Sequence, residues 1–62
     1  MTKKLLASSG SLDGLRRLID VYLCGCAVLI LHADGRIENG KGVLSSVAWE
    51  CRRGRYRFYR LT

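Results

Sequence analysis

The sequence predicts an α+β domain in which one amphipathic helix packs on a small antiparallel sheet of three to five strands, ending in a β-hairpin. Three observations lead to this class. Apolar residues recur at helical spacing over residues 11–23, strand-like segments fill residues 27–62, and a two-residue turn signal separates the last two strands. A chain of 62 residues suits a single domain, so we expect residues 1–62 to form one unit with the element order β-α-β-β-β-β.

The first ten residues are expected to form either a short strand or an ordered arm. Residues 3–8 read Lys-Lys-Leu-Leu-Ala-Ser, and the Ser-Ser-Gly that ends at Gly10 breaks the pattern. If this segment pairs with a later strand, it supplies the first strand of the sheet.

The helix is expected over residues 11–23. Ser11 can cap it, because a serine hydroxyl accepts a hydrogen bond from a free amide of the first turn. Asp13 places a negative charge near the positive end of the helix dipole. Gly25 is expected to end the helix. The spacing of three and four residues produces one apolar stripe, formed by Leu12, Leu15, Leu18, Ile19, Tyr22 and Leu23.

Four strands are expected after the helix. Residues 27–32 form the first, the pair Asp34-Gly35 signals a hairpin, and residues 36–38 return as a short strand. Residues 40–42 read Gly-Lys-Gly and are expected to be a flexible connector. Residues 43–51 are then expected to form one long strand, with Ser45 and Ser46 in its middle on alternate faces.

The register of the last hairpin follows from its pattern. With Arg53-Gly54 as a two-residue loop, apolar residues meet apolar ones and charged residues meet charged ones, whereas a three-residue loop mixes the two kinds. The face expected to pack on the helix then holds Val47, Trp49, Cys51, Tyr56 and Phe58. The face expected to be open holds Glu50, Arg52, Arg55, Arg57 and Tyr59. One helix covers only one face of a sheet, so we expect the open face to be polar, to be thinly covered or to form the contact of a homodimer.

Positive charge is concentrated at one end of this chain. The formal net charge is +6, yet residues 51–62 hold five arginines and no acidic residue, while residues 1–50 are nearly neutral. Arginine grips phosphate through two parallel hydrogen bonds, and an aromatic ring can stack on an unpaired base. The sequence therefore predicts contact with nucleic acid or a nucleoprotein complex through Arg52, Arg53, Arg55, Arg57 and Arg60, with Tyr59 stacking on a base.

A second hypothesis assigns the same arginines to a protein partner. A compact chain without catalytic groups is the kind that a phage or plasmid encodes to block a host defence complex. In that case the arginine face would meet an acidic or nucleic-acid-guiding surface as a protein–protein inhibitor or adaptor.

The three cysteines and one histidine invite comparison with a zinc site. Three thiolates and an imidazole would complete a tetrahedron, so the candidate ligands are Cys24, Cys26, His32 and Cys51. Only one residue separates the first two cysteines, and no second paired motif follows, which argues against a metal. We expect instead that the cysteines are small buried hydrophobic residues and that His32 belongs to the hairpin.

The remaining expectations concern class and location. No constellation of nucleophile, base and orienting group is recognisable, so neither an enzyme nor a cofactor is expected. The longest apolar run, residues 21–31, is too short to span a membrane. An odd number of cysteines and the lack of a signal sequence predict a cytoplasmic protein with free thiols.

Overall fold

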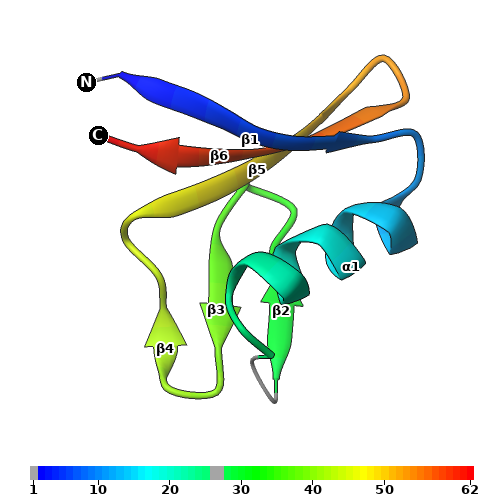
Figure 1. Ribbon diagram of the computed structural model, residues 1–62. Helices are drawn as coiled ribbons and strands as arrows, with labels where there is room; N and C mark the ends of the chain where they lie inside the picture. Colours follow the sequence, from blue (N-terminus) through cyan, green and yellow to red (C-terminus); the bar gives the residue numbers. More distant parts are fainter. Residues whose placement is uncertain (1, 26–27) are drawn as a thin grey trace.

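The computed structural model describes residues 2–25 and 28–62, and within them the chain forms one helix and six strands (Figure 1). The strands form two antiparallel three-stranded sheets, with the orders β1-β6-β5 and β2-β3-β4. The predicted α+β class, with one helix and a C-terminal hairpin, is confirmed. The elements are β1 (Lys3–Ser9), α1 (Leu12–Tyr22), β2 (Leu29–Leu31), β3 (Ile37–Asn39), β4 (Gly42–Val43), β5 (Val47–Arg52) and β6 (Arg55–Leu61).

Helix α1 begins and ends at the predicted signals. Ser11 has an extended backbone, and its hydroxyl accepts a hydrogen bond of 3.0 Å from the amide of Gly14. At the other end Cys24 and Gly25 both have positive φ, and the Gly25 amide donates to the carbonyl of Asp20 at 3.0 Å. A left-handed residue after the last turn lets its amide reach a free carbonyl, which is why the helix stops here.

The N-terminal segment is a strand. β1 pairs antiparallel with β6, from Lys3 opposite Leu61 to Ser9 opposite Tyr56, with an irregularity in register between Leu5 and Ala7. Of the two expectations for this segment, the strand is confirmed and the ordered arm is wrong.

The hairpin of β5 and β6 has the predicted register throughout, from Val47 opposite Arg60 to Arg52 opposite Arg55. Arg53 and Gly54 have φ values of 54° and 74°. A two-residue turn with both residues in the left-handed region matches the twist of the strands it joins.

The prediction of one long strand over residues 43–51 is wrong. β4 ends at Val43, and β5 starts at Val47. Between them the chain leaves the second sheet for the first, and the Leu44 amide donates to the carbonyl of Ile37 at 2.8 Å. Leu44 turns toward the core there, so Ser45 and Ser46 lie exposed in a turn instead of inside a strand.

The core lies between α1 and the two sheets. Figure 1 shows α1 and the second sheet on the same side of the β1-β6-β5 sheet. The ring of Tyr22 meets the ring of Phe58 edge-on, with 5.3 Å between centroids. Cys51, predicted to face the core, is exposed, because it lies nearer the end of the hairpin than Val47 and Trp49, the residues of β5 that pack in or against the core. The fully or nearly buried apolar side chains among the described residues are Leu15, Ile19, Ile37, Val47 and Phe58.

Candidate nucleic-acid interface

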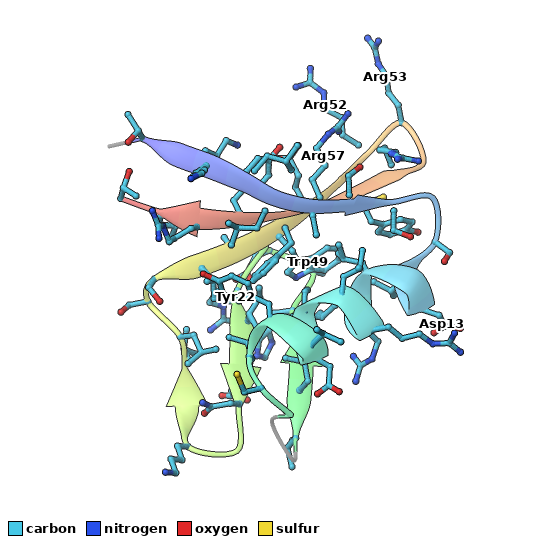
Figure 2. The ribbon with its side chains drawn as sticks, in the orientation of Figure 1. Asp13, Tyr22, Trp49, Arg52, Arg53 and Arg57 are labelled. Atoms are coloured by element: carbon cyan, nitrogen blue, oxygen red, sulfur yellow. The ribbon has the colours of Figure 1, made fainter. Side chains whose placement is uncertain are left out.

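The face of the β1-β6-β5 sheet turned away from α1 carries most of the predicted binding residues. Figure 2 shows the side chains of Arg52, Arg53 and Arg57 on the side opposite Trp49 and Tyr22. We call this surface the open face. It includes Lys3 of β1 and is hollowed by about 520 Å³ around Glu50, Arg52, Arg53, Arg55, Arg57 and Tyr59.

Glu50 is the one acidic residue in the sequences of β1, β5 and β6, and it is already paired. Its carboxylate accepts a hydrogen bond of 3.1 Å from Lys3 Nζ and lies 4.0 Å from Arg57 Nη1. The hydrogen bond from Lys3, with the positive charges of Lys3 and Arg57, holds the pKa of Glu50 below its usual range. Glu50 therefore stays ionised near neutral pH and cancels only one of the positive charges of the open face.

Tyr59 was predicted to stack on a base, but its ring already has a partner. Lys3 Nζ lies 4.4 Å from the centre of the ring, within the range of a cation–π contact. The ring itself is half-buried. Stacking of a base on the side of the Tyr59 ring that Lys3 covers would require Lys3 to move away from it.

The arginines nearest the turn keep most of their donors free for a partner. Arg52 and Arg55 are directly opposed, which brings two like charges together across the strands. Arg55 Nε donates to Ser8 Oγ at 2.8 Å, which uses one of the five donors of this guanidinium. Arg53, in the turn, is exposed.

Arg60 is separated from the other predicted binding residues. Strand alternation places it on the opposite face of β6, where it pairs with Val47 on one side and Lys4 on the other. The structure thus brings together Arg52, Arg53, Arg55 and Arg57 but not Arg60.

Two residues of the open face were not predicted from the sequence, Lys3 and Ser8. Both reach it because β1 pairs with β6, and each contacts a residue 47 positions away along the chain. The only local signal was the basic start of the chain, which did not indicate a strand partner.

The candidate metal ligands that the structure describes, Cys24, His32 and Cys51, do not form a cluster. The described residues contain no cluster of three or more His, Cys, Asp or Glu side chains. Cys24 and Cys51 are exposed, so the expectation that they are buried is wrong for both, and Cys26 lies outside the described residues. His32 is in the β2–β3 hairpin, as predicted, with its amide donating to the carbonyl of Arg36 at 2.9 Å.

Within the residues that the structure describes, no helix is long and apolar enough to cross a membrane. No protein-family model, curated protein or solved structure matches this chain.

Proposed function

We propose that this chain is a non-enzymatic binding protein that contacts nucleic acid through the open face. The observation that carries the proposal is the charge balance of that face. Its cations come from three separate segments, namely β1, β6 and the end of β5 with its turn, while its single carboxylate is already held by Lys3.

Phosphate is the partner group that this arrangement suits. A guanidinium offers a planar fork of donors that matches two phosphate oxygens, and each phosphate neutralised releases condensed counterions. With Arg52, Arg53, Arg55 and Arg57 engaged, the logarithm of affinity should fall with the logarithm of salt concentration at a slope of about −3.6. Between 50 and 200 mM salt, this slope corresponds to a loss of affinity of roughly 150-fold.

A homodimer through the open face is disfavoured by the same charges. Two copies meeting face to face would set arginines against arginines, and like charges brought together across an interface cost binding energy. We therefore propose a partner of opposite charge for this face. We also propose that the protein acts in the cytoplasm, where its free thiols would stay reduced.

The proposal is tested with a pair of charge-reversal variants. Arg52→Glu with Arg55→Glu reverses two charges of the open face but keeps the cross-strand pair like-charged, so the hairpin meets a similar repulsion. The matched control, Arg17→Glu with Lys41→Glu, makes the same change in net charge at exposed positions on α1 and in the β3–β4 turn. Circular dichroism is used to check that both variants fold.

Binding is measured by fluorescence anisotropy on labelled DNA and RNA at several salt concentrations. We expect the open-face variant to lose most of its affinity and the control to keep it, apart from a small general electrostatic loss. Equal losses in the two variants, or no binding to any nucleic acid, would refute the proposal. A complex captured from host lysate that survives nuclease treatment would favour an acidic protein partner instead.

A further inference from the structure

We infer that the nucleic acid is double-stranded DNA and that the end of the β5–β6 hairpin enters its major groove. The inference rests on the proposed function and names the partner more narrowly. The part of the molecule concerned is residues 51–55, which we call the tip.

The tip is a free two-stranded ribbon. β1 runs alongside β6 only as far as Ser9 opposite Tyr56, so beyond that point β5 and β6 have no third strand beside them. All five residues of the tip are exposed. In Figure 1 the turn stands clear of α1 and of the second sheet.

The dimensions of the tip suit a major groove. Two paired strands lie about 4.8 Å apart, and the major groove of B-form DNA is about 12 Å wide, enough to admit a two-stranded ribbon. At about 3.3 Å per residue, the tip extends roughly 7 Å from Cys51 to its turn, a little less than the groove depth of about 8.5 Å, and the arginine side chains add to this reach.

The donors of the tip match what the groove presents. Arg52 and Arg53 are exposed at the tip, and an arginine fork can bind O6 and N7 of guanine in two hydrogen bonds. Arg55 also belongs to the tip, but its Nε is held by Ser8 of β1. Arg57 and Lys3 lie farther back on the same face, where backbone phosphates on the rim of the groove would meet them.

The aromatic residues argue against a single strand. Binding of unpaired bases relies on exposed rings as stacking platforms. All five aromatic rings of this chain already contact another side chain: Tyr22 with Phe58, Trp49 with Tyr56, and Tyr59 with Lys3. Phe58 is in addition fully buried. Tyr22 is exposed, but it lies on α1, on the other side of the sheet from the open face. On the open face itself, the ring of Tyr59 is half-buried and already holds Lys3.

Duplex RNA is disfavoured by the shape of its grooves. The major groove of an A-form helix is deep and narrow, so protein side chains do not reach its base edges. A ribbon tip of this width therefore distinguishes B-form from A-form duplexes.

The first test compares three probes of the same sequence: a 20-base-pair DNA duplex, its single strand and the corresponding RNA duplex. We expect the DNA duplex to bind at least about tenfold more tightly than either of the others. Equal or tighter binding to the single strand or to RNA would overturn the inference and leave the proposed function standing. Failure to bind all three would overturn both.

Variants separate groove insertion from stacking. Arg53→Asn removes an arginine from the tip. Asparagine tolerates the positive φ of this turn position, so the hairpin should stay intact. We expect it to weaken duplex binding at least about fivefold, while Lys41→Asn changes it by less than about twofold. Tyr59→Leu should also change affinity by less than about twofold, whereas loss of a stacked base would cost at least about fivefold.

Dimethyl sulfate protection locates the groove, because the reagent methylates guanine N7 in the major groove and adenine N3 in the minor groove. We expect the protein to protect N7 and not N3. Protection of N3 alone, or of neither atom at saturating protein, would refute insertion of the tip.

Discussion

Replacing Arg52 with glutamate should stabilise the fold and weaken nucleic-acid binding at the same time. Arg52 and Arg55 are directly opposed at the last pair before the turn, so the native hairpin carries a like-charge contact. Directly opposed like charges destabilise a sheet, and opposite charges stabilise it by roughly 0.2–1 kcal/mol. Changing one kind of pair into the other should raise the free energy of unfolding by about 1 kcal/mol.

The assay is thermal unfolding followed by circular dichroism. For a domain of this size, 1 kcal/mol raises Tm by about 4–8 °C. Both side chains are exposed, so salt should screen the effect: the Debye length falls from about 10 Å at 0.1 M to about 3 Å at 1 M. We expect most of the Tm gain to disappear at 1 M salt, and Arg52→Gln to give a smaller gain at low salt.

Binding should move in the opposite direction. The variant loses one phosphate-binding cation, so the slope of log affinity against log salt should become shallower by about 0.9. A lower Tm at low salt, or a Tm gain that persists at 1 M, would refute the reasoning about the pair. Unchanged binding would show that Arg52 does not contact the partner.

Three further predictions concern the core, two turn glycines and the pairing of Lys3 with Glu50. Phe58→Ala should destabilise it by about 3–5 kcal/mol, because this ring is fully buried, and denaturant unfolding that shows a loss below 1 kcal/mol would contradict its place in the core. Gly35→Ala should cost about 1–3 kcal/mol, because φ is +99° and an added Cβ would lie 2.9 Å from a backbone carbonyl of β5. Gly54→Ala, with φ +74° and open space around it, should lower the free energy of unfolding by only about 1 kcal/mol. Equal losses in the Gly35 and Gly54 variants would show that the close approach of the carbonyl at Gly35 does not matter. Because the pKa of Glu50 is lower in the folded state, the ionised carboxylate stabilises the fold at pH values above the usual glutamate pKa of about 4.3. This stabilisation is lost as the pH falls through the folded-state pKa. Lys3→Met should raise that pKa toward its usual value in an NMR titration, and an unchanged pKa would refute the role of the Lys3 hydrogen bond.

The parts of the fold that the sequence predicts well are those decided by neighbouring residues. The helix has its cap and its terminating glycine within a few positions of its ends. The last hairpin has a two-residue turn, and only one register separates its apolar residues from its charged ones. These signals are local, so they do not depend on what the rest of the chain does.

The features that sequence reasoning missed depend on distant contacts. Residues 43–51 are all compatible with a strand, and the break at Leu44 exists because that residue joins a core shared with Ile37. Lys3 joins the open face only through strand pairing at long range. Nearness in the sequence groups Arg60 with the other arginines. Strand alternation already places it opposite Val47, on the other face of the hairpin.

The pairing of β1 with β6 has a consequence for how the protein is made. Lys3 and Leu61 are partners, so β1 leaves the ribosome well before β6, the strand with which it pairs. Pairing over such a long separation forms slowly, because closing a long loop costs entropy before any contact forms. In the meantime β1 exposes Leu5, Leu6 and Ala7. Lys3 and Lys4 precede this apolar segment, and charged residues beside such a segment oppose pairing with other nascent chains. The lysines of β1 would thus keep the nascent strand from pairing with other chains before Lys3 contributes to the open face.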